Sequence, residues 1–110
     1  MSGREFAGRL RERVVVEALT GERNALGAQM PEYEVVARCL AAVAPEGVGA
    51  EAEGQALSAM ARFRVTIRVR DGISVGQRLR WRERVLIIRQ RIDDPALPDR
   101  IVLRCEEIRS

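Results

Sequence analysis

Apolar and polar side chains alternate in "RFRVTIRVRDG", residues 62–72, as far as Arg70. Successive side chains on a β-strand point to opposite faces, so this pattern predicts a strand with one face against a core. The core face carries Phe63, Val65, Ile67 and Val69. The opposite face carries four arginines, Arg62, Arg64, Arg68 and Arg70. The stretch therefore predicts a half-buried strand that presents a row of guanidinium groups to its surroundings.

Similar patterns along the chain predict further strands. These cover residues 13–19, from Tyr33 up to Pro45, 77–82, 85–92 and 100–108, with a turn at Asp71-Gly72 and a tight connection near Glu83-Arg84. The apolar run of residues 85–88 fits a strand that is covered on both sides. Short strands at this spacing predict a mainly β fold, a small antiparallel β-barrel of about six strands, because closure removes exposed strand edges.

The predicted core faces follow from the alternation. They take in two sets besides that of residues 62–70: the odd-numbered residues Tyr33, Val35, Ala37, Cys39, Ala41 and Val43, and the later residues Leu79, Trp81, Ile101, Leu103 and Cys105. Of the four aromatic residues, Tyr33, Phe63 and Trp81 fall on these faces.

Two segments interrupt the β pattern. Residues 20–31 contain two glycines and a proline and predict a loop. In "APEGVGAEAEGQALSAMA", residues 44–61, Pro45, Gly47 and Gly49 predict a flexible loop. Residues 50–61 then predict one short inserted helix, because their apolar side chains recur at helical spacing. We interpret residues 1–110 as a single domain with this helix and a long loop.

The composition argues against catalysis and against a metal or cofactor site. The chain has no histidine and two cysteines, Cys39 and Cys105, without a Cys-x-x-Cys motif, so neither zinc nor another metal is expected. Both thiols fall on predicted core faces, where they are inert. No apolar run approaches the ~20 residues of a membrane span, and the start "MSGREFAGRL" lacks a signal-peptide core. We expect synthesis in the cytosol, no membrane contact, no cofactor and no catalytic residue.

The net charge of +3 is unevenly distributed. Residues 62–91 hold ten arginines against two acids, which is +8, whereas the rest of the chain holds nine arginines against fourteen acids, which is −5. Three interpretations of the arginine rows remain open: a solvated outer face, contact with nucleic-acid phosphates, or pairing with the acids of a neighbouring copy. Segregated charge suits a head-to-tail ring, because heterologous contacts join unlike surfaces. The acids of such a contact would be Glu32, Glu34, Glu46, Glu51 and Glu53.

Five sequence features, in order, resemble the head-tail joining, or head-closure (stopper), proteins of tailed phages and gene transfer agents. The opening "GRLRERVVVE" is similar to the family's first strand, and "EYEVVARCLAAVAPEG" to its aromatic followed by a V-W-A-x-V-x-P segment. The insert "AEAEGQALSAMA", the stretch "VTIRVRDGISVGQRLRWRERVLIIRQRIDD" and the closing "IVLRCEE" complete the series. Leu40 and Val69 stand where the family usually has Trp and often has Tyr.

The resemblance implies a structural β-barrel in a homo-oligomeric ring of roughly six or twelve copies at the neck of the particle. Such a ring seals the DNA exit channel after packaging, around the packaged double-stranded DNA. Its neighbours are a portal or adaptor ring on the head side and a tail terminator or tail tube on the other. The alternatives are a neighbouring adaptor or tail-terminator ring protein, or an OB-like oligonucleotide-binding module.

The resemblance also implies two sets of site residues. The channel-gating loop corresponds to Pro45, Glu46, Gly47, Val48, Gly49, Ala50, Glu51, Ala52, Glu53, Gly54 and Gln55. Acidic side chains repel phosphate, so we expect this loop to block the channel rather than grip DNA. The surface facing a subunit, a partner or DNA corresponds to Arg62, Arg64, Arg68, Arg70, Arg78, Arg80 and Arg82.

Overall fold

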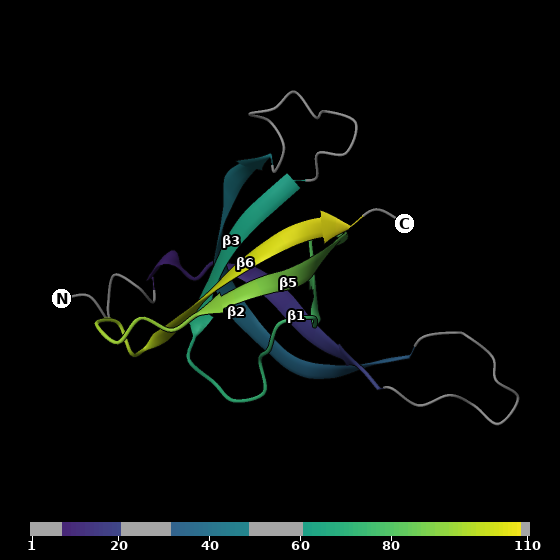
Figure 1. The fold of residues 1–110 in the computed structure, drawn as a ribbon, viewed down its shortest axis with the longest axis horizontal. Coiled ribbons are helices and arrows are strands. Elements are labelled where there is room, and N and C mark those ends of the chain that lie inside the picture. The colour runs from purple at the N-terminus through teal and green to yellow at the C-terminus, as the bar shows by residue number, and fades with distance from the viewer. Residues whose placement is uncertain (1–7, 21–31, 49–60, 109–110) are drawn as a thin grey trace, which may run out of the picture.

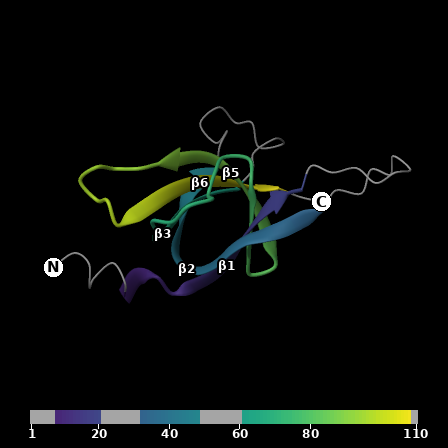
Figure 2. The ribbon, with the colours of Figure 1, turned by 90° about the horizontal axis from the view of Figure 1, so that it is seen from below.

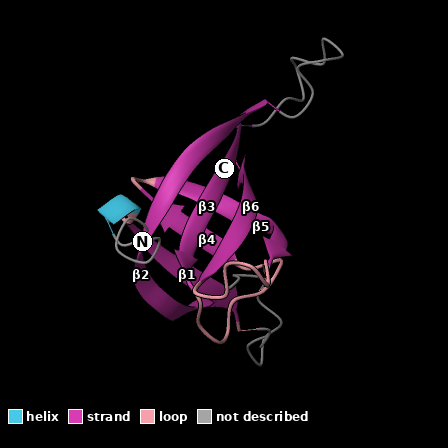
Figure 3. Cartoon of the chain, turned by 90° about the vertical axis from the view of Figure 1, so that its left-hand side faces the viewer, coloured by secondary structure: helices cyan, strands magenta, loops and turns pink. Residues whose placement is uncertain are grey.

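Six antiparallel strands close into a barrel in this computed structural model, which describes residues 8–20, 32–48 and 61–108 (Figure 1). In chain order, they are β1 (Glu12–Leu19), β2 (Tyr33–Val48), β3 (Ala61–Arg68), β4 (Arg78–Trp81), β5 (Arg84–Ile92) and β6 (Arg100–Ile108). Around the barrel, the order is β1-β2-β3-β6-β5-β4, so β4 closes the barrel against β1 (Figure 3). The predicted six-stranded antiparallel barrel is confirmed.

Regular helix is minimal in the part of the chain that the structure describes. Gly8 and Arg9 form a helical turn before β1 (Figure 3). The predicted inserted helix over residues 50–61 lies outside the described residues, except Ala61, which begins β3. The predicted loop over residues 20–31 also lies outside them, apart from Thr20. Within the described ranges, no helix is long and apolar enough to cross a membrane.

Buried apolar side chains fill the barrel interior, and those of β3, β4 and β6 are the ones that the alternation assigned to it. On β3, Val65 and Ile67 are fully buried and Phe63 is 7% exposed. The other strands contribute Val14, Val16, Leu79, Trp81, Leu86, Ile88, Ile101, Leu103 and Cys105. Burial of apolar surface stabilises a fold by roughly 25 cal/mol per Å², so this interior is the main source of the barrel's stability.

The β4–β5 hairpin agrees with its prediction to within one residue. The turn falls at Arg82 and Glu83, both of which have positive φ, one residue before the predicted connection. In β5, Leu86 and Ile88 are fully buried, whereas Val85 and Ile87 are half-buried. The outer face of this strand is therefore only partly covered. The prediction of full cover on both sides is wrong for this face.

The alternation of residues 62–70 fails at its last two positions. The β3–β6 pairing ends at Arg68, and the amide of Val69 donates a hydrogen bond to the carbonyl of Asp99 (3.0 Å). Because the chain leaves the sheet there, Val69 is 51% exposed rather than buried, and Arg70 is half-buried. The turn follows at Gly72, whose φ of +89° suits glycine.

A β-bulge in β2 moves Tyr33 and Val35 off the core face. Val16 pairs with Ala37 but Glu17 pairs with Val35, so Val36 is an extra residue in β2. After the bulge, Ala37 and Ala41 point inward as predicted. Before it, Tyr33 is 36% exposed and Val35 is 45% exposed, so the prediction that both face the core is wrong. A bulge inverts the alternation of every residue on its far side.

β2 does not stop at Pro45 but continues to Val48. The β1–β2 pairing ends where Glu12 meets Ala41, and beyond that point β2 pairs only with β3 among the described residues. Proline lacks an N–H donor, and a strand tolerates it where one edge is open. Pro45 through Val48 are therefore strand residues rather than the predicted loop, and the register shifts between Pro45 and Val48.

Candidate functional site

The arginines of β3 lie on the outside of the barrel, as predicted. The side chains of Arg62 and Arg64 are 47% and 51% exposed, and Arg68 is also exposed. The register places Arg64 opposite Arg104, and Arg68 opposite Arg100. Like charges directly opposite each other on a sheet are destabilising, so these pairs need carboxylates nearby.

Two acidic side chains, Glu46 and Glu106, each contact two arginines of this face. Glu46 approaches Arg64 (3.9 Å) and Arg104 (3.2 Å), and its side chain is 17% exposed. Glu106 in the same way approaches Arg62 (3.6 Å) and Arg89 (3.2 Å). Much of the positive charge of the β3–β6–β5 face is thus balanced within the chain.

The arginines of β4 stabilise the contact between β1 and β4 where the barrel closes, which we call the seam. The side chain of Glu17 on β1 is 8% exposed and accepts a hydrogen bond from Arg78 Nε (2.5 Å), while Arg80 lies 3.6 Å away. The guanidinium carbon of Arg78 also lies 3.5 Å from the centre of the Tyr33 ring. The geometry gives this row a structural role, and its contact with a partner or DNA stays a prediction.

Arg82, in the turn that follows β4, belongs to a second contact across the same seam. Glu12 accepts hydrogen bonds from Trp81 Nε1 (2.8 Å) and from Arg82 (2.9 Å). The Trp81 hydrogen bond is the main cause that lowers the pKa of Glu12 from its ordinary 4.5, and the charge of Arg82 adds to it. The native state therefore favours the charged form of this carboxylate.

The lowered pKa of Glu12 predicts a loss of stability in acid. A folded-state pKa below the unfolded value contributes stability that is present at neutral pH and is lost as the pH falls below about 4.5. Glu12→Gln should be less stable than the wild type at neutral pH and should lose less stability over the acid range. Melting temperatures across this pH range test the prediction, with exposed Glu34→Gln as the control. Equal slopes for wild type and Glu12→Gln would contradict it.

The two cysteines are free thiols, of which Cys105 is buried and Cys39 is half-buried. Burial raises the pKa of both, that of Cys105 to about 12. They are therefore protonated at neutral pH, as expected for core residues rather than nucleophiles. Among the described residues, no group of three or more His, Cys, Asp or Glu side chains is arranged to hold a metal ion.

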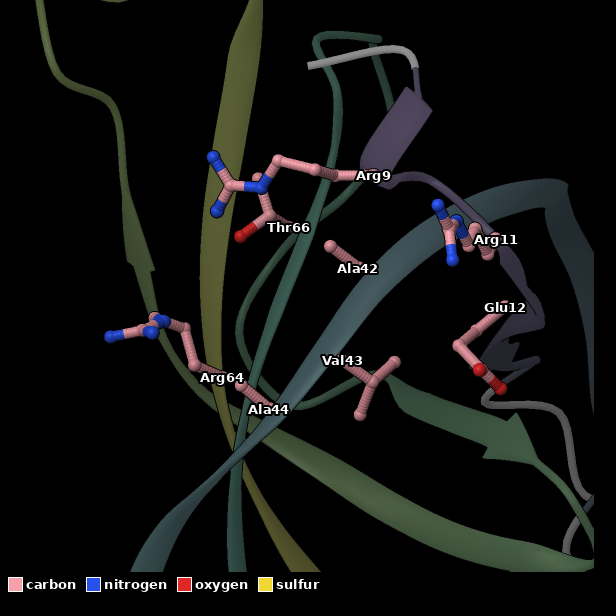
Figure 4. Close-up of a pocket in the computed structure, with 8 residues that line it drawn as sticks. All are labelled: Arg9, Arg11, Glu12, Ala42, Val43, Ala44, Arg64 and Thr66. Atoms are coloured by element: carbon pink, nitrogen blue, oxygen red, sulfur yellow. The ribbon is translucent and has the colours of Figure 1, made fainter. Parts of the chain in front are cut away.

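A shallow cleft of about 390 Å³ opens where β1 separates from β2 (Figure 4). Its floor contains Ala42, Val43 and Ala44 of β2, beside the β2 edge that β1 leaves open. Arg9, Arg11, Glu12, Arg64 and Thr66 line its sides. From Ala42 onward, this edge of β2 has no partner strand among the described residues.

Sequence reasoning missed the arginines that have no acidic partner in the part of the chain that the structure describes. Arg9, Arg11, Arg13 and Arg38 are exposed, and none forms an ion pair with another described residue. They belong to the part of the chain whose summed charge is negative, so the charge count pointed elsewhere. The alternation of Arg9, Arg11 and Arg13 in "GRLRER" was the signal that could have revealed them.

The predicted channel-gating segment is described only in part. Pro45 to Val48 belong to β2, and Glu46 is held by the β3 and β6 arginines. Residues 49–55 lie outside the described residues, so the gating role of this segment stays a prediction. Of the predicted arginines, Arg70 stands apart, because its Nε is buried and makes no hydrogen bond among the described residues.

Comparison with known proteins points to one family. The solution structure of protein SF1141 from Shigella flexneri 2a is 26% identical to this chain, with a TM-score of 0.66 over 91% of this chain and 94% of that one. A chain from the virion of a native gene transfer agent particle has the same fold, with a TM-score of 0.70 at 16% identity over 93% and 98% of the two chains. No curated protein matches the sequence. The family model described as phage head completion protein matches residues 7–108, so this chain belongs to the phage head completion protein family.

Proposed function

We propose that this protein is a structural subunit of the connector between the head and the tail of a phage-like particle, located at its neck. The observation that carries the proposal is the family match over residues 7–108. The barrel supports it physically, because its interior is packed with apolar side chains and its outer face carries charge for contacts. Many copies would form a ring that closes the DNA exit channel and provides the docking surface for the tail.

In this proposal, the connection between β2 and β3 narrows the channel. Glu46 near the end of β2 forms ion pairs with Arg64 on β3 and Arg104 on β6, so the part of β2 that leads into the connection is held against the barrel wall. Glu46 therefore has a structural role, and the residues that block the channel are those of 49–55. Because Glu51 and Glu53 repel phosphate, closure acts by blocking the path of DNA rather than by gripping it.

The partners in the proposal follow from the position of such a ring. The ring contacts a portal or adaptor ring on the head side, and a tail terminator or tail tube on the other side. Packaged double-stranded DNA is its third neighbour. No step in this function requires a cofactor or a reacting side chain.

Deletion of the gene tests the proposal in cells that produce the particles. We expect heads that lose their packaged DNA and carry no tail, with full rescue by the wild-type gene supplied in trans. The measurement is the fraction of DNA that resists nuclease, together with a count of tailed particles by electron microscopy. Tailed particles that retain protected DNA without this chain would contradict the proposal.

A further inference from the structure

Two surfaces of the barrel carry charged side chains of opposite sign, and beside each lies a strand edge without a partner among the described residues. At one end, β1 and β2 extend past the rest of the barrel, and we call residues 18–19 and 32–35 the β1–β2 finger (Figures 1 and 2). At the opposite end lie Gly8, Arg9 and the cleft of Figure 4. A head-to-tail contact between copies joins two unlike surfaces, and opposite charge makes such surfaces complementary.

The finger has open edges and exposed apolar side chains. The β1–β4 pairing ends at Glu17, and the β2–β3 pairing begins only at Ala41, so the finger strands pair only with each other among the described residues. Leu19 and Val35 are 57% and 45% exposed. Exposed strand edges with apolar side chains are templates for pairing with another chain.

The charge of the finger is negative. Glu32 and Glu34 are both exposed, and neither forms an ion pair with another described residue. The backbone amide of Thr20 donates a hydrogen bond to the carbonyl of Glu32 (2.9 Å), so the acids stay close to the paired end of the finger.

The cleft offers the complementary features. From Ala42 onward, β2 pairs only with β3 among the described residues, so its other edge presents backbone donors and acceptors. Arg9 and Arg11 flank this edge and form no ion pair with another described residue. Pro45 has no N–H, so an added strand pairs best with the residues that precede it.

We propose that the β1–β2 finger of one copy docks by strand addition against the open edge of β2 in the next copy. The main chain supplies affinity through added hydrogen bonds, as in other β-augmentation contacts. Glu32 and Glu34 then approach Arg9 and Arg11 of the neighbour, which selects the orientation. This inference rests on the proposed function. It adds to the proposed ring the contact that joins neighbouring subunits.

Disulfide trapping in purified particles tests this contact. A chain with both Ala44→Cys in the cleft and Val35→Cys on the finger should give a ladder of multimers after mild oxidation, because each copy links to the next. Ala44→Cys with Val75→Cys is the matched control, since Val75 is 57% exposed in the β3–β4 connection. This control and each single variant should stay monomeric.

The outcomes separate this inference from the proposed function. Monomers from the double variant, with the chain present in the particles, would overturn the inference and leave the proposed function standing. Absence of the chain from particles contradicts the proposed function, and oxidation of the concentrated purified variant then decides the inference. A ladder in solution supports the contact, and monomers alone overturn it.

Charge reversal gives a second test in the trapping background. Arg9→Glu with Arg11→Glu should lower the yield of multimers by about tenfold, because like charges then face each other across the contact. Glu32→Arg with Glu34→Arg should do the same, and co-expression of the two double variants should restore the ladder. Arg13→Glu with Arg38→Glu, an equal charge change away from the cleft, should leave the yield unchanged. A ladder that is insensitive to reversal at Arg9 and Arg11 would contradict the orientation.

Discussion

Leu103→Ala should lower the free energy of unfolding by about 2–5 kcal/mol, the largest effect that we expect from a single substitution in this chain. Leu103 of β6 is fully buried, and its register partner Val65 on β3 is fully buried as well. Truncation removes apolar contacts and leaves a cavity in a closed barrel whose strands cannot easily move inward.

Urea unfolding followed by the fluorescence of Trp81, the single tryptophan, measures this effect. Leu40→Ala is the matched control, because it makes the same change at a side chain that is 48% exposed. We expect the control to change the free energy of unfolding by no more than about 0.5 kcal/mol. A similar loss for the two variants would mean that the barrel interior is not the main source of stability.

Glu17→Ala should lower the free energy of unfolding by about 3 kcal/mol. Its side chain is 8% exposed and contacts Arg78 (2.5 Å) and Arg80 (3.6 Å) at the seam between β1 and β4. Removal of one partner leaves the others without their countercharge, which is costly where water is partly excluded. The 26% exposure of the Arg78 side chain keeps the cost below that of a fully buried pair.

Two further variants show whether this loss of stability comes from the contacts of Glu17 at the seam. Glu34→Ala removes an exposed carboxylate from the neighbouring strand and should have little effect on the free energy of unfolding. Glu17→Gln keeps the shape and one acceptor, so it should fall between wild type and Glu17→Ala. If Glu17→Ala is as stable as Glu34→Ala, the contacts of Glu17 with Arg78 and Arg80 do not stabilise the seam.

Strand number and core faces were predictable from the sequence where alternation ran without interruption. Phe63, Val65 and Ile67 follow it, and so do the inward residues of β4 and β6. Tyr33 does not, because the extra residue Val36 inverts the alternation and a bulge has no period of its own. The strand was predicted to end at Pro45, but it continues. Proline ends a strand only where the neighbouring strand needs a backbone N–H donor at that position.

The interaction surfaces were only partly predictable. The outward direction of the β3 arginines followed from alternation, but their partners did not. Glu46 meets Arg104 across 58 residues of sequence, a pairing that depends on barrel closure and strand register. The charge count drew attention to residues 62–91, much of whose charge is balanced within the fold. The alternating arginines at the start of β1 are visible in the sequence, but only the three-dimensional arrangement shows that they form no ion pair with another described residue.

Electron cryomicroscopy of the neck of purified particles will show whether this chain is a subunit of the connector between head and tail. We predict an annulus between portal and tail in which each subunit matches the barrel of strands β1–β6, with the β2–β3 connection directed toward the channel. A neck in which every density is accounted for by other proteins, with this chain absent, would contradict the account.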